Sequence, residues 1–286
     1  MHAALVELLD LLDLERIESD LFRGRNERSA MPRVFGGQVL AQALRAAALT
    51  APERPPHSLH AYFLRPGDSA RPILFEVERV RDGRSFATRR VRAIQAGEPI
   101  FAMSASFHVR EGGLEHQAEP RAVPRPDALE DDVLVARRLQ GQDANVMPWQ
   151  TRERAFECRS VHPVGTPQPD SPLKPAWYRA RAGIPAEAEE GALHECLLAY
   201  VSDMGLMSTS LVPHAASTPR SRIVGASLDH AMWFHRPLRV DQWLLYDRDS
   251  PTAAASRGFN RGAFFAEDGT LLASTAQESL IRVRRD

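Results

Sequence analysis

The sequence predicts an α+β protein made of two similar domains, each with one helix followed by an antiparallel meander of strands. The first observation behind this prediction is an internal repeat. Phe-Leu-Arg-Pro at residues 63–66 recurs as Phe-His-Arg-Pro at residues 234–237, an offset of 171 (234 minus 63). Later segments keep the same order at offsets of 171 to 173: residues 84–87 match 257–260, and residues 100–104 match 271–275. A repeat of this length is a whole domain, because solenoid units span only ~20 to 50 residues.

Length and composition are the second observation. A chain of 286 residues with 43% apolar residues is long enough for about two domains. A proline-rich stretch at residues 111–174 predicts a connection between the two copies. We therefore assign residues 1–110 to an N-terminal domain, 111–150 to a linker and 151–286 to a C-terminal domain.

The expected elements follow from the residue pattern. Leucines at positions 5, 8, 9 and 12 have the spacing of an amphipathic helix, and the Ala-rich and Leu-rich residues 37–49 predict a second helix. In the first copy we expect strands at 59–63, 73–80, 85–94 and 100–109. Between the copies we expect a short helix at 128–139 and the start of the second sheet at 158–161. In the second copy we expect a helix at 193–207 and strands at 176–182, 227–236, 242–248, 253–265 and 270–282.

Charge and cysteine content limit the possible partners. The net charge is −1, which gives no general attraction to nucleic acid or to an anionic membrane. The acidic residues among the first 15 positions do not fit a secretory signal, and we find no apolar run of ~18 residues. With only two cysteines, the expectation is a cytoplasmic protein with neither nucleic acid nor membrane as a partner.

Asp203 is the most informative single residue. It falls on the apolar face of the predicted helix at 193–207, where an ionised carboxylate is costly unless it is solvated, paired or held for a task. It is therefore either a catalytic group or a structural, hydrogen-bonded Asp. Gly36 and Gly37 at the start of the other helix leave backbone N–H groups accessible to an oxyanion, or simply form a tight turn.

Other catalytic schemes lack their residue patterns. The sequence has no G-x-S-x-G elbow, no Walker motif and no G-x-G-x-x-G loop. Cys196 lies on the predicted buried face, and buried thiols such as this are usually inert. The pairs His57/His60 and His230/His235 do not have zinc-site spacing, so we expect no metal.

Several motifs together resemble the type II acyl-CoA thioesterase family. The resemblance covers nearly the whole chain in the family's order and is clearest in Leu-Asp-His-Ala-Met-Trp-Phe-His-Arg-Pro at residues 228–237. The other matching segments are residues 21–24, 34–39, 62–68, 81–86, 254–259 and 273–278.

The resemblance implies a double hot-dog fold, in which two helices are each wrapped by antiparallel sheet. It implies hydrolysis of fatty acyl-CoA to a free acid and coenzyme A without a cofactor, with Asp203 as the catalytic acid beside Ser227 and Gln277. Many members have Thr at the position of Ser227, and both residues carry the hydroxyl. In this scheme Asp203 takes a proton from water held by Ser227 and Gln277, and amides near Gly36 and Gly37 receive the oxyanion.

Two other functions remain open for such a fold. Hot-dog hydratases and dehydratases use a His with an acidic partner, so a His sharing the cleft with Asp203 is the feature that would distinguish them. A non-catalytic acyl-CoA-binding protein is the other alternative. We also expect a homo-oligomer, since hot-dog proteins commonly pair their sheets across subunits. At an offset of 171, Gln277 corresponds to Ser106 and Ser227 to Pro56, and Gln42 is the nearest counterpart of Asp203.

Overall fold

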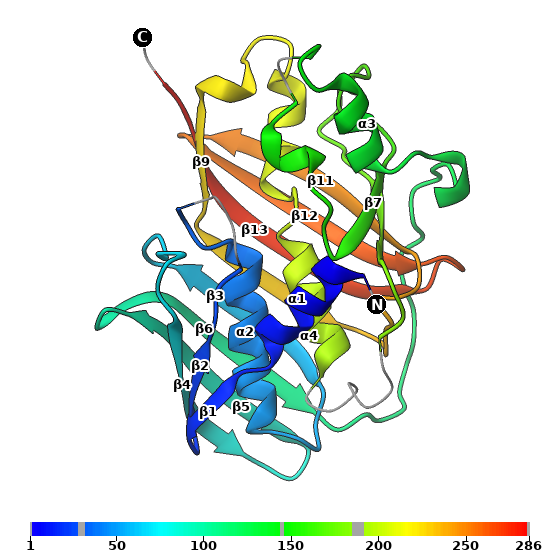
Figure 1. The fold of residues 1–286 in the computed structure, drawn as a ribbon. Coiled ribbons are helices and arrows are strands. Elements are labelled where there is room, and N and C mark those ends of the chain that lie inside the picture. Colours follow the sequence, from blue (N-terminus) through cyan, green and yellow to red (C-terminus); the bar gives the residue numbers. More distant parts are fainter. Residues whose placement is uncertain (1, 28–31, 144–145, 185–191, 285–286) are drawn as a thin grey trace.

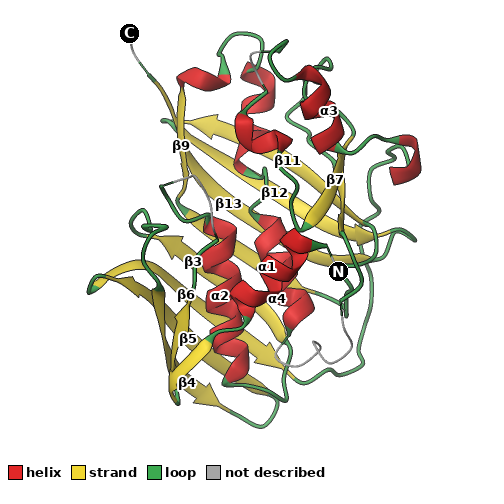
Figure 2. Cartoon of the chain, in the orientation of Figure 1, coloured by secondary structure: helices red, strands yellow, loops and turns green. Residues whose placement is uncertain are grey.

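The computed structural model describes residues 2–27, 32–143, 146–184 and 192–284. One antiparallel sheet runs through both halves of the chain and curves around two helices (Figures 1 and 2). The four α-helices of the described residues are α1 (Ala3–Leu12), α2 (Gly36–Leu49), α3 (Asp132–Leu139) and α4 (Leu193–Ser202). The N-terminal strands are β1 (Glu15–Glu18), β2 (Leu21–Gly24), β3 (Pro56–Phe63), β4 (Ile73–Asp82), β5 (Phe86–Gln95) and β6 (Glu98–His108). The later strands are β7 (Phe156–Ser160), β8 (Ala176–Ala180), β9 (Ile223–Ser227), β10 (Asp229–Phe234), β11 (Leu244–Ala254), β12 (Arg257–Ala266) and β13 (Leu271–Val283).

The two halves join within the sheet. The strand order is β1-β2-β4-β5-β6-β3-β10-β13-β12-β11-β8-β7, and β9 pairs with β13 beside this path. The junction is the antiparallel pair β3 and β10, in which Ala61 lies opposite His230. The α+β double hot-dog prediction is therefore confirmed, and the halves share one continuous sheet.

Helices α2 and α4 pack against each other inside the curve of the sheet, in opposite directions (Figure 1). Helix α2 is buried along most of its length, which its small Ala side chains permit. Gly37 brings the two backbones close, since a Cβ there would lie 2.5 Å from the carbonyl oxygen of Tyr200. The start of α2 thus meets the end of α4, and the end of α2 meets the start of α4.

Strand pairing corrects the sequence alignment of the two halves. Ala61 lies opposite Met103 in the pair β3/β6, and Met232 lies opposite Thr275 in the pair β10/β13. The offset is therefore 171 on the first strand of each pair (232 minus 61) and 172 on the second (275 minus 103). The inward-facing counterpart of Gln277 is accordingly Ala105 and not Ser106, because a slip of one residue moves a side chain to the other face.

The helix ends correct a second counterpart. Asp203 follows the last residue of α4, and Thr50 follows the last residue of α2 in the same right-handed backbone conformation. Counted from the helix ends, Thr50 rather than Gln42 matches Asp203, since Gln42 lies in the middle of α2.

Three predicted elements of the second half have different limits. The helix expected at 193–207 ends at Ser202, and after Gly205, with φ of +72°, the chain continues as a 3₁₀ helix at Met207–His214. The strand expected at 227–236 is interrupted at Leu228 between β9 and β10. The strand expected at 253–265 contains a hairpin instead, since Ala255 and Ser256 have positive φ between β11 and β12.

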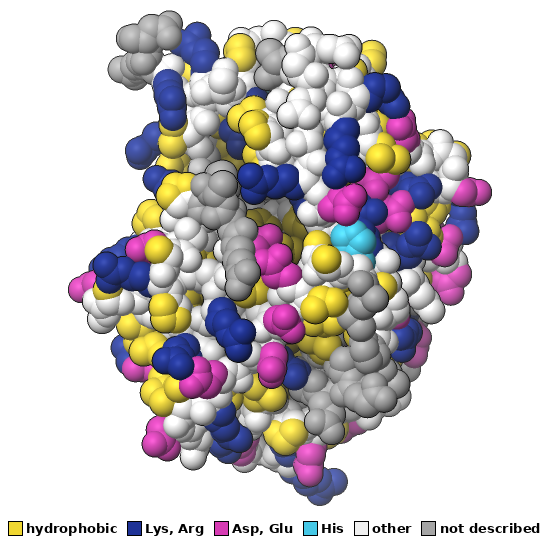
Figure 3. Space-filling view, viewed as in Figure 1, with side chains coloured by type: hydrophobic (Ala, Val, Ile, Leu, Met, Phe, Trp, Pro, Cys, Tyr) yellow, Lys and Arg dark blue, Asp and Glu magenta, His cyan; other side chains and the backbone are white. Residues whose placement is uncertain are grey.

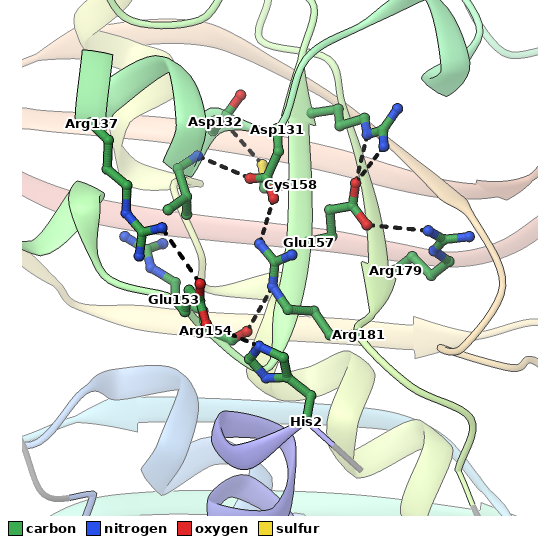
Figure 4. A network of polar contacts seen from close by, with 12 residues as sticks. His2, Asp131, Asp132, Arg137, Glu153, Arg154, Glu157, Cys158, Arg179 and Arg181 are labelled. Carbon is green, nitrogen blue, oxygen red and sulfur yellow. Dashed lines mark hydrogen bonds and ion pairs between the residues drawn. The ribbon is translucent and has the colours of Figure 1, made fainter. Parts of the chain in front are cut away.

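The predicted connection packs on the second half through ion pairs (Figure 4). Asp131 accepts hydrogen bonds from the Val133 N–H and from the Arg181 guanidinium, the latter at 2.6 Å. Glu153 contacts Arg137 and also His2, which precedes helix α1. The proline-rich segment around α3 is thus fixed to residues next to β7 and β8. The domain boundaries at residues 110 and 150 stay a prediction.

The charge distribution on one face and the burial of one apolar segment bear on whether nucleic acid or a membrane is a partner. On the face drawn in Figure 3, basic and acidic side chains of the described residues are interspersed. Residues Leu193–His214, which comprise α4 and the following 3₁₀ helix, are long and apolar enough by composition to cross a membrane, a criterion that buried core helices also meet. Here 61% of its apolar window is buried, because α4 and the following 3₁₀ helix are core elements.

Candidate active site

Asp203 lies at the C-terminal end of α4, where the last backbone carbonyl groups have no N–H donor within the helix. Two buried side chains satisfy these carbonyls. The Tyr246 hydroxyl donates to the Ser202 oxygen at 2.8 Å, and Arg248 Nη1 donates to the Met204 oxygen at 3.0 Å. The Arg248 cation is only 1% exposed and also suits the negative end of the helix dipole. The backbone on both sides of Asp203 is therefore fixed.

The three residues predicted to act together do lie together. Gln277 Nε2, from β13, donates to Asp203 Oδ1 at 2.7 Å. The Ser227 hydroxyl, at the end of β9, donates to the same oxygen at 3.2 Å. Within the described part of the chain, Asp203 Oδ2 accepts no hydrogen bond, so the two carboxylate oxygens are in different environments.

Oδ2 faces the start of helix α2. A Cβ added at Gly36 would lie 2.8 Å from Asp203 Oδ2 and 3.0 Å from the ring of Phe63. The missing side chain of Gly36 therefore lets the start of α2 approach the carboxylate closely. Gly37 has an additional packing role, since its missing side chain permits the close contact of α2 with α4.

The first turn of α2 supplies hydrogen-bond donors beside the carboxylate. First-turn N–H groups have no intrahelical acceptor, and Phe35 at the N-cap provides no side-chain cap. The amide of Gln38 is satisfied by the Phe35 carbonyl at 3.1 Å. The amides before it, at Gly36 and Gly37, have the position and polarity to bind an oxyanion.

His230 is a site residue that the sequence analysis missed. It lies on β10, is 1% exposed, and its Nδ1 is 3.1 Å from Gln277 Nε2. Burial lowers the pKa of His230 to about 4, although the nearby Asp203 carboxylate acts in the opposite direction. The ring is therefore neutral at pH 7. Its inward position on a strand is the only signal in the sequence, where the spacing of His230 and His235 bears only on a metal site.

A His therefore shares the site with Asp203, which was the feature expected of a hydratase or dehydratase. Its contacts differ from that expectation. Both ring nitrogens are occupied by protein groups, Gln277 on one side and the Ser202 hydroxyl at 2.9 Å on the other. Neither nitrogen contacts the Asp203 carboxylate directly, so the pair does not form a His-acid dyad.

The other candidate groups, the two cysteine thiols and the possible metal ligands, do not form a reactive site among the described residues. Burial raises the pKa of the Cys196 thiol to about 12, and burial with the nearby Asp132 carboxylate raises the pKa of Cys158. Neither thiol is poised to ionise at neutral pH. Across the described residues, no group of three or more His, Cys, Asp or Glu side chains is arranged to hold a metal ion.

Two antiparallel helices wrapped by one sheet define a double hot-dog protein, and the Asp203 carboxylate lies where the two helices meet. Comparison with known proteins gives the family. A family model described as acyl-CoA thioesterase matches residues 152–280, and one described as the acyl-CoA thioesterase N-terminal domain matches residues 26–108. The chain belongs to the acyl-CoA thioesterase family.

Individual relatives agree over nearly their full length. The chain is 39% identical to acyl-CoA thioesterase 2 of Haemophilus influenzae, covering 99% of both chains. It is 40% identical to human acyl-coenzyme A thioesterase 8, covering 96% of this chain and 88% of that protein. The crystal structure of acyl-CoA thioesterase II TesB2 from Mycobacterium marinum matches with a TM-score of 0.80 and 40% identity, covering 97% and 98% of the two chains.

The same fold also occurs in a dehydratase. The dehydratase domain of PpsC from Mycobacterium tuberculosis matches with a TM-score of 0.54 at 11% identity, covering 96% of this chain and 99% of that one. At this identity the likeness shows the fold alone.

Proposed function

We propose that this protein hydrolyses fatty acyl-CoA thioesters to a free fatty acid and coenzyme A, with Asp203 as the general base that activates water. The observation that carries the proposal is the unequal environment of its two oxygens. Ser227 and Gln277 both donate to Oδ1 and hold the carboxylate in one orientation. Oδ2, which lies beside Gly36, is left to accept a proton from a water molecule.

The reaction balances with the groups at the site. Water loses a proton to Asp203 Oδ2 as its oxygen bonds to the thioester carbonyl carbon. The carbonyl oxygen becomes an oxyanion, which the Gly36 and Gly37 amides stabilise at the start of α2. When the intermediate collapses, the C–S bond breaks, and the coenzyme A thiolate takes the proton from Asp203. No covalent enzyme intermediate is required.

Ser227 contributes a second interaction. Because its hydroxyl proton is donated to Asp203 Oδ1, its oxygen lone pairs are left to accept a hydrogen bond from the attacking water. Gln277 acts mainly on the carboxylate, since its Nε2 faces both Asp203 and His230.

The test is the release of free thiol from decanoyl-CoA, followed with a thiol reagent, for wild type and Asp203→Asn. Asn keeps an oxygen that accepts from Gln277 and Ser227 but lacks the basic oxygen, so we expect kcat to fall about 1,000-fold with the melting temperature unchanged. Asp127→Asn is the matched control, because this carboxylate is exposed and lies in the 3₁₀ turn Pro126–Ala128, away from the site residues. Undiminished turnover by Asp203→Asn would reject the mechanism.

The same preparation separates the alternatives. A non-catalytic acyl-CoA-binding protein would bind decanoyl-CoA without releasing thiol. A hydratase would consume the double bond of an enoyl-CoA while the thioester stays intact. The cytoplasmic location and the homo-oligomer stay predictions, and light scattering of the purified protein tests the second of these.

A further inference from the structure

His230 belongs to a chain of buried hydrogen bonds that ends on the catalytic Gln277. The chain runs from the Ala199 carbonyl through the Ser202 hydroxyl and His230 to Gln277. Ser202 and Gln277 are both 0% exposed, and His230 is 1% exposed. In such a dry environment each donor needs an acceptor, so the direction of every bond can be worked out.

The direction follows from Ser202. Its hydroxyl donates to the Ala199 carbonyl at 2.8 Å, so its oxygen acts as an acceptor toward His230 Nε2 at 2.9 Å. Nε2 therefore carries the proton of the neutral imidazole. The other nitrogen, Nδ1, is left with a lone pair, and the group 3.1 Å from that lone pair is Gln277 Nε2.

This arrangement fixes the amide of Gln277. Its Nε2 has two hydrogens, one for Asp203 Oδ1 and one for His230 Nδ1. Its oxygen accepts from the Ser279 hydroxyl at 3.1 Å. A rotation that exchanges the amide oxygen and nitrogen would set an oxygen against both the Asp203 carboxylate and the His230 lone pair, which is electrostatically unfavourable.

We propose that His230, held as its Nε2–H tautomer by Ser202, is a positioning residue that orients the Gln277 amide toward Asp203. The inference rests on the proposed function, since it gives His230 a role through the catalytic carboxylate. His230 touches neither Asp203 nor Gly36 through its ring nitrogens, so it acts through Gln277 alone. The low pKa of the buried ring agrees with a histidine that stays neutral over the working pH range.

The first half of the chain supports this coupling. The pair Leu59 and Ala105 occupies the positions that His230 and Gln277 occupy in the second half. Both members of the pair are apolar there, and both are buried. The histidine and the glutamine are thus present together at one end of the molecule and absent together at the other.

Two substitutions of His230 test the contacts of its two ring nitrogens one at a time. His230→Asn places an amide oxygen near the position of Nδ1 and keeps an acceptor for Gln277, whereas His230→Gln reaches Ser202 but loses that acceptor. We expect kcat for decanoyl-CoA to stay within about 3-fold of wild type for His230→Asn and to fall about 10-fold or more for His230→Gln, with KM unchanged in both. Equal kcat values for the two variants would overturn the proposal.

A double-mutant cycle tests whether the effect passes through Gln277. In a Gln277→Ala background, His230→Gln should change kcat by less than about 2-fold, because no amide is left to orient. A full 10-fold effect in that background would show that His230 acts by another route. Asp203→Asn, assayed alongside, separates failure of the proposed function from failure of this inference. Undiminished turnover of Asp203→Asn would reject the proposed function. Equal kcat values for His230→Asn and His230→Gln, with Asp203→Asn inactive, would reject only the role of His230.

A measurement on the wild type needs no variant to fold. Imidazole ¹⁵N chemical shifts of histidine-labelled protein should show His230 as the neutral Nε2–H tautomer at pH 7. An Nδ1–H tautomer or a charged ring would contradict the proposal. Ser202→Ala should allow the ring to change tautomer, with a fall in kcat as its consequence.

Discussion

The two ends of the paired helices α2 and α4 have the same backbone plan but opposite chemistry. At one end, Asp203 closes α4 beside Gly36, with Gln277 and His230 on the facing strands. At the other end, Thr50 closes α2, and the facing strand positions carry Ala105 and Leu59.

The inward polar residues next to these positions also differ. Arg89 lies opposite Ala105 in the sheet, as Asn260 lies opposite Gln277. The Arg89 guanidinium donates to the side chain and the carbonyl oxygen of Thr50, at 2.8 and 2.9 Å, and thereby closes the helix end. A hollow of about 390 Å³ near this end is bordered by alanines and by the ion pair of Arg110 with Glu195.

The difference shows how one fold can serve two purposes. At the proposed active end, one Asp203 oxygen accepts no hydrogen bond from the described residues and the start of α2 has no side-chain cap, an arrangement that costs stability. At the opposite end Arg89 satisfies the side chain and the carbonyl oxygen of Thr50, which favours stability. Substitutions at the two ends should therefore separate activity from folding.

The largest expected effect is at the stable end. Arg89→Met removes a buried cation that donates to Thr50, Arg81 and Thr88, and leaves their oxygens without these partners. We expect the free energy of unfolding to fall by about 3 kcal/mol with kcat unchanged, measured by urea denaturation and thiol release. Arg90→Met is the control, because Arg90 is 56% exposed and its pair with Glu78 should contribute less than about 1 kcal/mol. Loss of activity in folded Arg89→Met would contradict the division between the ends.

The next effect is at the active end. Gly36→Ala places a methyl group against Asp203 Oδ2, so we expect kcat to fall about 100-fold while the protein stays folded. Gly37→Ala should instead lower the melting temperature, because its Cβ meets the Tyr200 backbone oxygen. Gly113→Ala, where nothing lies within 4 Å, should change neither quantity. Full activity of Gly36→Ala would mean that water does not approach Oδ2 beside Gly36.

A third effect depends on pH. The unfolded His230 takes up a proton near pH 6.5, whereas the buried ring resists protonation until about pH 4. Its contribution to stability is therefore present above pH 6.5 and is lost as the pH falls from 6.5 to about 4. Between pH 7 and pH 5, wild type should lose about 2 kcal/mol more than His230→Asn in urea unfolding. An equal loss in both proteins would show that the ring is not held neutral by burial.

The smallest effect concerns Ser227. Ser227→Ala removes one of the two donors to Asp203 Oδ1 and should lower kcat about 10-fold, whereas Ser227→Thr keeps the hydroxyl and should stay within about 3-fold. Steady-state thiol release measures both variants. A Thr variant as slow as the Ala variant would indicate that the space around Ser227, and not its hydroxyl, matters.

Residue pattern alone predicted much of the fold. The leucine spacing of α1, the Ala-rich α2 and the alternation in β4, β5, β6 and β13 all gave elements close to those observed. The hairpin between β11 and β12 was missed because Ala255 and Ser256 adopt positive φ without a glycine at either position. The short strands β1 and β2 were missed because four residues carry too little periodicity to be recognised.

The site was predictable only in part. Resemblance to the family selected Asp203, Ser227 and Gln277, and these three do lie in contact. His230 could not be selected, because its partners Ser202 and Gln277 lie 28 and 47 residues away in the chain. The counterpart of Gln277 was misassigned because the sequence repeat matches residues 100–104 to 271–275 at an offset of 171, whereas strand pairing gives an offset of 172 there.

The sequence by itself determined that this protein has two copies of one α+β unit, that it resembles acyl-CoA thioesterases, and which three residues are candidates for the site. Only the tertiary structure decided which carboxylate oxygen is held and which is open, and how His230 and Gln277 are coupled. The physical reason is distance. Periodicity and propensity are local properties, whereas a hydrogen bond such as Gln277 to Asp203 requires atoms 74 residues apart in the chain to lie 2.7 Å apart in space.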